Sequence, residues 1–85
     1  MTLMKLDDLD PETSAFKILV HLTFRGQPLK PIDISRELGE NNSSVRARLA
    51  ELKRDGLVDS RGDGYVALTT TYDILMKLYR QPKEK

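Results

Sequence analysis

Residues 34–58 read ISRELGENNSSVRARLAELKRDGLV, and the order of signals in this stretch decides the fold. Apolar residues recur there at helical spacing, since Val45, Leu49 and Leu52 are four and then three positions apart. This stripe predicts a helix over about 43–54, ended by the Asp-Gly pair that follows it. The turn and capping residues before the stripe are Glu40, Asn41, Asn42 and Ser43, and one of Asn42, Ser43 and Ser44 is expected to cap the helix.

A second, shorter helix is predicted over about 31–38. Pro31 suits the first turn of a helix, and Gly39 fits the left-handed position that ends many helices. About four residues then lead into the next helix. Two short helices joined by such a turn, with a glycine in it, form a helix-turn-helix.

Beyond Gly56 the apolar spacing changes from that of a helix to that of strands. The runs LVDS at 57–60 and YVAL at 65–68 flank the turn-forming sequence RGDG. We expect a β-hairpin over 57–68, with its two-residue turn either on Gly62-Asp63 or on Asp63-Gly64. A hairpin directly after the third helix makes the helix-turn-helix a winged one.

Two further helices complete the expected domain. Asp10-Pro11-Glu12 predicts the start of a helix of about 14 residues that stops at Gly26. Three threonines at 69–71 offer a cap for a last helix. The predicted fold class is α+β, mainly α: a winged helix-turn-helix with a three-helix core, a two-stranded wing and a C-terminal helix. It would occupy residues 10–80, between an N-terminal arm at 1–9 and a flexible tail at 81–85.

The quoted segment resembles the winged helix-turn-helix core of MarR-like and ArsR-like transcription regulators. The likeness rests on the pattern Ile-Ser-x-x-Leu-Gly, Ser-Ser-Val, Gly-Leu-Val, and on the strand exit Tyr-Val-Ala-Leu-Thr at 65–69. It covers about residues 12–79. The resemblance implies a DNA-binding regulator. The exit from the wing, from Leu68 to Leu75, is also similar to the winged domain that precedes archaeal RIO-type kinases, which implies an RNA- or protein-binding module.

A recognition helix enters the major groove with its N-terminal residues toward the base edges. On a helical wheel the face opposite the apolar stripe centres on Ser43, Ala47, Ala50 and Arg54. It is flanked by Arg46 and Lys53 on one side and by Ser44 and Glu51 on the other. Arg46 can pair bidentately with guanine, and Ala47 allows close approach or contact with a thymine methyl. The expected DNA-binding residues are Asn42, Ser43, Ser44, Arg46, Ala47, Lys53, Arg54 and Arg61.

These positions are expected to play different parts. Lys53 and Arg54 suit phosphate contacts, and Arg61 on the wing suits the backbone or the minor groove. Arg48 falls nearer the buried stripe, so a surface ion pair with Glu51 or Asp55 is the better interpretation.

Composition limits the remaining classes of function. The formal net charge is only +1, but residues 41–62 carry five basic and three acidic side chains, as a basic footprint would. There is no cysteine, and the single histidine, His21, has no cluster of acids around it in sequence, so neither a metal site nor a cofactor is expected. No nucleophile motif or other catalytic constellation indicates an enzyme. No apolar run reaches the roughly 18 residues of a membrane span, and the acidic N-terminus is unlike a secretory signal, so a cytoplasmic location is expected.

The terminal segments carry more apolar residues than one face of a three-helix core requires. They are Leu3, Met4, Leu6 and Leu9 at the start and Leu75, Met76, Leu78 and Tyr79 near the end. We expect a homodimer through the N-terminal arm and the C-terminal helix, reading two half-sites of double-stranded DNA. Intramolecular packing of the arm on the last helix is the other interpretation. The alternative function is a winged-helix module that binds protein or RNA without specific DNA binding, favoured by the near-neutral charge and the short wing.

Overall fold

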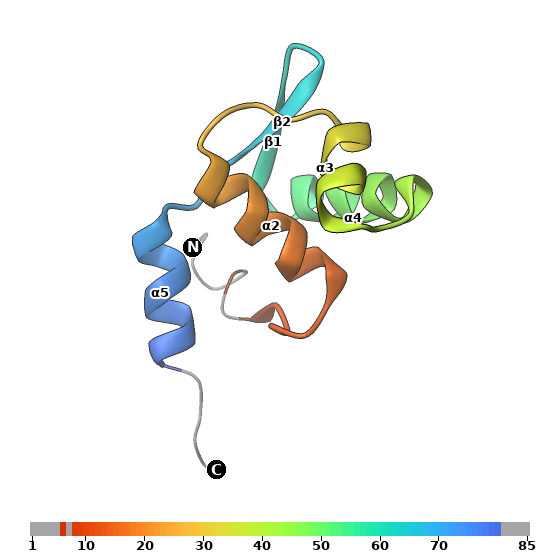
Figure 1. The fold of residues 1–85 in the computed structure, drawn as a ribbon. Coiled ribbons are helices and arrows are strands. Elements are labelled where there is room, and N and C mark those ends of the chain that lie inside the picture. Colours follow the sequence, from red (N-terminus) through yellow and green to blue (C-terminus); the bar gives the residue numbers. More distant parts are fainter. Residues whose placement is uncertain (1–5, 7, 81–85) are drawn as a thin grey trace.

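The computed structural model describes residue 6 and residues 8–80, and its elements have the predicted order (Figure 1). They are α2 (Ser14–Arg25), α3 (Pro31–Leu38), α4 (Asn42–Arg54), β1 (Val58–Arg61), β2 (Gly64–Ala67) and α5 (Thr71–Tyr79). Helices α2, α3 and α4 pack together, the hairpin projects from them, and α5 packs on α2. The predicted α+β, mainly helical, winged helix-turn-helix layout is confirmed.

The start of α4 differs by one residue from the prediction, and so does its cap. Asn41 is the N-cap: its Oδ1 accepts hydrogen bonds from the backbone N–H groups of Ser43 at 2.8 Å and Ser44 at 3.2 Å. Asn41 belongs to the set of turn and capping residues predicted from the sequence, but the expectation that one of Asn42, Ser43 and Ser44 caps the helix is wrong. Asn42 instead takes the first helical position, because an Asx side chain one residue earlier already satisfies the free N–H groups.

The predicted start of α2 is also wrong. Asp10, Pro11 and Glu12 form a turn, in which Asp10 Oδ1 accepts from the Glu12 N–H at 2.9 Å. The helix begins only at Ser14, because Thr13 caps it by accepting the Phe16 N–H on Oγ1 at 3.3 Å. A local Asx turn thus competes successfully with a helix start. The helix ends at Arg25, just before Gly26, as expected.

The wing has a defined register. Val58 pairs with Ala67 and Arg61 with Gly64, which leaves Gly62-Asp63 as the two-residue turn. Gly62 has a φ of 57° at the first turn position, where glycine suits a hairpin turn. Of the two turns that the sequence left open, this one is adopted.

A third backbone segment joins the wing, and the sequence did not indicate it. Leu29, between α2 and α3, exchanges two backbone hydrogen bonds with Tyr65 at 2.8 and 3.0 Å. A side chain on Gly64 would meet the Leu29 backbone at 2.9 Å, so this close approach requires glycine. The base of the wing is thereby fixed to the helical core.

One apolar cluster connects all these elements. Its buried members are Leu6, Ala15, Phe16, Ile18, Leu19, Leu22, Leu29, Ile34, Val45, Leu49, Leu52, Leu57, Val58 and Ile74. Leu6 of the expected N-terminal arm is only 1% exposed, so this residue packs within its own chain. The remainder of the predicted arm at 1–9 is outside the described residues at positions 1–5 and 7, and so is the predicted tail at 81–85.

Candidate nucleic-acid interface

The exposed surface of α4 is made only of small and basic residues. The exposed positions of this helix are Ser43, Ser44, Arg46, Ala47, Ala50, Lys53 and Arg54. Its single acidic residue, Glu51, is half-buried and lies at the edge of this face, between Ala47 and Ser44, where it pairs with Arg48. Asp55 at the C-cap is also half-buried. The outward face therefore combines positive charge with short side chains. A duplex could approach such a surface closely.

The rotation of α4 about its axis is fixed by its buried face. Val45 and Leu49 are fully buried, and Leu52 is 1% exposed. These residues pack against α2 and α3. Rotating α4 so that its opposite face turned inward would remove all three from the core. The exposed set is thus a rigid surface on a regular element.

Three guanidinium groups extend from α4 and the wing without a partner in the described part of the chain. They belong to Arg46, Arg54 and Arg61, all of which are exposed. An unpaired arginine keeps all its N–H donors available for phosphate or for a guanine edge. These three residues meet the electrostatic requirement for the roles predicted for them.

Arg48 has a different environment, as the sequence led us to expect. Its Nε and Nη2 donate to the two carboxylate oxygens of Glu51 at 3.0 and 2.8 Å. Both side chains are partly exposed, so the pair adds only a few tenths of a kcal/mol, about 0.3–0.5. The pair matters here because it neutralises Arg48, which is therefore the one arginine of α4 that is not available on the exposed face.

Lys53 links the recognition helix to the wing. Its Nζ donates to Ser60 Oγ on β1 at 3.1 Å. The C-terminal half of α4 and the first wing strand consequently form one continuous polar surface. Ser60 was not among the predicted site residues, because nothing in the sequence shows that strand β1 returns beside Lys53.

Asn42 fits its predicted role least well. The residue is half-buried, and within the described residues its Oδ1 is buried without a hydrogen-bond donor. At the tip of the wing, Asp63 is exposed and two residues from Arg61. The basic surface is therefore bounded at one end by an inward-turned amide and at the other by a negative charge.

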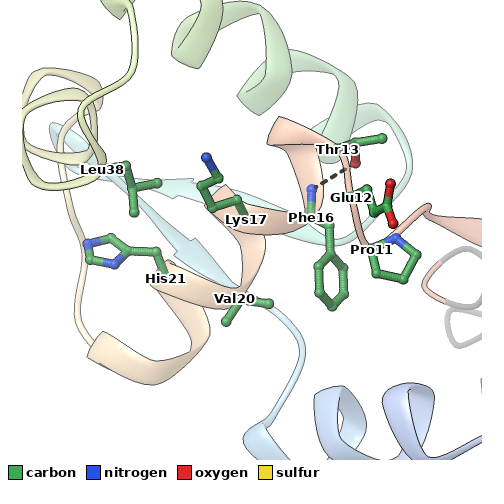
Figure 2. Close-up of a pocket in the computed structure, with 8 residues that line it drawn as sticks. All are labelled: Pro11, Glu12, Thr13, Phe16, Lys17, Val20, His21 and Leu38. Atoms are coloured by element: carbon green, nitrogen blue, oxygen red, sulfur yellow. Dashed lines mark hydrogen bonds between the residues drawn. The ribbon is translucent and has the colours of Figure 1, made fainter.

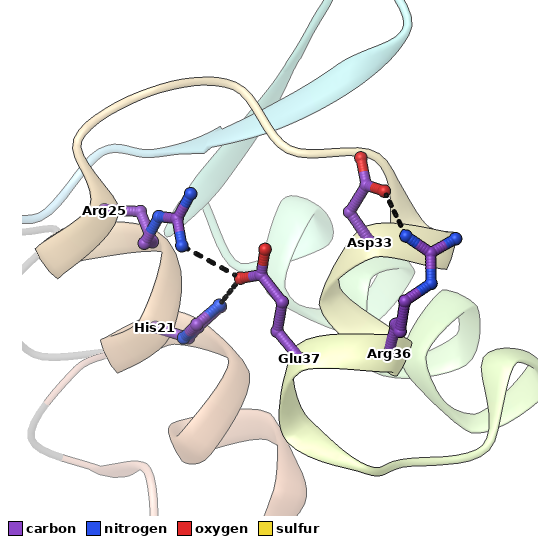
Figure 3. Close-up of polar contacts among 5 residues, drawn as sticks. All are labelled: His21, Arg25, Asp33, Arg36 and Glu37. Atoms are coloured by element: carbon purple, nitrogen blue, oxygen red, sulfur yellow. Dashed lines mark hydrogen bonds and ion pairs between the residues drawn. The ribbon is translucent and has the colours of Figure 1, made fainter.

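Polar side chains connect the helix-turn-helix to α2. Glu37 on α3 accepts hydrogen bonds from His21 at 2.5 Å and from Arg25 at 3.2 Å, both on α2 (Figure 3). Glu40, in the turn between α3 and α4, pairs with Lys17 at 2.8 Å. The hydrogen bond and charge of Lys17 hold the pKa of the Glu40 carboxyl below its usual range. These contacts fix the turn that immediately precedes the cap of α4.

A pocket of about 460 Å³ lies beside α2 and does not belong to this surface (Figure 2). Its lining surface is mainly apolar, its polar members are Glu12, Thr13, Lys17 and His21, and α4 and the wing contribute no lining residue. Lys17 is paired with Glu40 and His21 with Glu37, and Thr13 Oγ1 caps α2, so these three side chains already have partners within the chain.

Comparisons with protein-family models, with curated proteins and with solved structures found no match. Within the described residues, no helix is long and apolar enough to cross a membrane.

Proposed function

We propose that this chain binds double-stranded DNA, with α4 in the major groove and the wing against the backbone. The observation that carries the proposal is the composition of the outward face of α4, on which all seven exposed residues are small or basic and the bordering Glu51 is paired with Arg48. The short side chains of Ala47 and Ala50 leave room for a duplex to approach the unpaired arginines closely. The resemblance to MarR-like and ArsR-like regulators points in the same direction and makes transcription regulation the expected use of the binding.

Each basic residue has a role that follows from its position. Arg46 lies in the N-terminal half of α4 with a free guanidinium group, so it is the residue proposed to read a guanine edge. Arg54 and Lys53 lie at the other end of the helix and are proposed to contact phosphate, Lys53 together with Ser60. Arg61, on β1 of the wing, is proposed to contact the DNA backbone or the minor groove.

The proposal includes a homodimer and a cytoplasmic location. A single small module neutralises few phosphates, and two copies bound to half-sites about one helical turn apart would add their contacts. The location follows from the need to meet duplex DNA.

A salt titration of DNA binding tests the proposal. Fluorescence anisotropy of a labelled mixed-sequence duplex gives the dissociation constant at each salt concentration. We expect a steep fall in affinity with salt. For Arg46→Ala the slope should be smaller by up to about one unit of log K per log salt for each phosphate that the arginine neutralises. If Arg46 pairs with guanine instead, the variant should bind the preferred sequence more weakly by about 1–3 kcal/mol.

Arg48→Ala is the matched control. It removes the same charge from the same helix two residues away, but from a side chain that is paired with Glu51. We expect it to bind DNA nearly as the parent chain does. Equal losses of affinity in the two variants, or no detectable duplex binding at low salt, would refute the proposed interface.

The alternative, a module that binds protein or RNA, draws on one observation. Asp63 places a negative charge at the wing tip, where a DNA backbone would repel it. Binding of single-stranded or structured RNA in preference to the duplex, in the same assay, would favour this alternative.

A further inference from the structure

The pocket beside α2 lies outside the surface proposed for DNA and has the size of a small-ligand site. Its volume of about 460 Å³ falls within the range of roughly 300–1,000 Å³ that such sites span. Its apolar surface comes from Phe16 and Val20 of α2, from Pro11 before that helix and from Leu38 at the end of α3. A cavity of this kind takes an apolar molecular body, and its few polar groups select the head group.

The polar side chains of the pocket are not equally available to a ligand. Lys17 and His21 are engaged by glutamates of the helix-turn-helix, and Thr13 caps α2. Among the polar lining residues of the described chain, Glu12 is the one whose side chain has no hydrogen bond or ion pair. The Glu12 carboxylate is therefore the group that can receive a head group without breaking an existing contact.

The free carboxylate and the apolar surface are within reach of one small molecule. Figure 2 shows Pro11 and Glu12 close to Phe16 at one end of the pocket, and His21 and Leu38 at the other. An elongated ligand can therefore lie along the apolar surface with its head group at the Glu12 end. That end is open to solvent, since Glu12 is exposed.

The charges around this end of the pocket favour a cation. The exposed residues Asp8 and Asp10 precede Glu12 in the chain, so three carboxylates belong to this segment. Lys77 Nζ lies 5.7 Å from the centre of the Phe16 ring, but Lys77 is only 4% exposed and does not line the pocket. An anionic head group at this end would be repelled by the carboxylates, whereas an ammonium group would be attracted.

We propose that this pocket binds a small amphiphilic amine in its cationic form. Its aromatic or aliphatic body packs against Phe16, Val20 and Leu38, and its ammonium group donates a hydrogen bond to the Glu12 carboxylate. Because Glu12 is exposed, the ion pair adds only modestly to the affinity, and burial of the apolar body supplies most of it. The site is independent of the proposed function, since no lining residue belongs to α4 or the wing.

Three probes that share a phenethyl body test the head group. They are phenethylamine, which is cationic, phenethyl alcohol, which is neutral, and hydrocinnamate, which is anionic. NMR titrations of the labelled whole chain follow the methyl groups of Val20 and Leu38 and the ring of Phe16. We expect saturable shifts with the amine and a dissociation constant on the order of 1 mM, as suits so small a ligand. The alcohol should bind about two- to fivefold more weakly, and hydrocinnamate more weakly still.

Two charge variants separate contact with Glu12 from the general field of the acidic segment. Glu12→Gln keeps the shape of the side chain and should weaken binding of phenethylamine about two- to fivefold, to the level of the alcohol. Asp8→Asn is the matched control, because it removes the same charge from an exposed residue that does not line the pocket. At about 0.15 M salt it should bind the amine nearly as the parent does.

A third variant tests the cavity itself. Val20 is half-buried and lines the pocket, so Val20→Trp should fill the pocket from an edge of the core. We expect the saturable shifts at Leu38 to disappear for all three probes. Circular dichroism should show parent helicity in this variant, and the two charge variants test the site even if it does not.

Several results would overturn the inference. They are the absence of saturable shifts at Val20 and Leu38 in the parent chain, binding of hydrocinnamate as tight as that of the amine, and equal affinities of Glu12→Gln and Asp8→Asn for the amine. The proposed function fails on a different result, the absence of duplex binding. Either proposal can therefore fail while the other stands.

Discussion

The cap of the recognition helix offers a sharp test of the structure, because two adjacent asparagines have different roles. Asn41 Oδ1 accepts two backbone N–H groups of the first turn of α4. Asn42 Oδ1 is buried and accepts none within the described residues. Replacing each residue with alanine removes the same side chain from neighbouring positions, and the structure predicts unequal effects on stability.

For Asn41→Ala the expected decrease is about 1 kcal/mol in the free energy of unfolding, the usual cost of removing an N-cap. In a domain of this size that lowers the midpoint of thermal unfolding by roughly 4–8 °C. For Asn42→Ala we expect a change within about 0.5 kcal/mol, since alanine favours the helix and the Asn42 amide oxygen accepts no hydrogen bond. Relief of the unsatisfied amide oxygen would add to the stability of this variant.

Thermal unfolding followed by circular dichroism at 222 nm measures both changes, and urea unfolding gives the free energies. A larger loss of stability in Asn42→Ala than in Asn41→Ala would contradict the structure, because Asn42 would then cap α4. Equal and small effects would show that neither side chain caps the helix. The same two variants in the DNA-binding assay would separate stability from contact.

Three more predictions concern the fold. Leu49→Ala removes a fully buried side chain from the inner face of α4 and should cost about 2–5 kcal/mol in urea unfolding; a cost below about 1 kcal/mol would contradict the packing of this helix. Glu40→Gln should destabilise the chain at neutral pH and much less in acid. The Lys17 contact lowers the pKa of the Glu40 carboxyl in the folded chain. The stabilisation from this contact is therefore present above the ordinary glutamate pKa and disappears as the pH falls through the lowered pKa. An effect of Glu40→Gln that does not depend on pH would contradict this expectation. Gly64→Ala should force the Leu29 backbone away from β2. Hydrogen exchange at the amides of Leu29 and Tyr65 should then become faster. Unchanged protection of these amides would show that the wing tolerates a side chain at residue 64.

The sequence predicted α3 to the residue and α4 to within one, because their signals are local. A proline opens α3, glycine closes it, and the spacing of Val45, Leu49 and Leu52 identifies the buried face of α4. The same wheel separated Arg48 from the exposed basic residues, since an angular position on a helix follows directly from residue number.

The errors lie where several residues could perform the same local task. Asp10 and Thr13 can each cap a helix, and so can Asn41 and its three successors; which one does so depends on tertiary packing beyond the local pattern. The bridge between Leu29 and Tyr65 and the contact between Lys53 and Ser60 join residues far apart in the chain or on different elements. No periodicity in a single sequence indicates such contacts.

The central claim is that the exposed face of α4 and the wing contact duplex DNA. Its most direct test is a titration of the ¹⁵N-labelled chain with a short duplex, followed by amide chemical shifts. The account predicts that the largest changes fall at residues 42–47, 53–54 and 60–62, while the amides of Tyr72–Tyr79 keep their positions at a constant degree of association. Changes concentrated on α5 or on the pocket beside α2, with α4 unaffected, would contradict it.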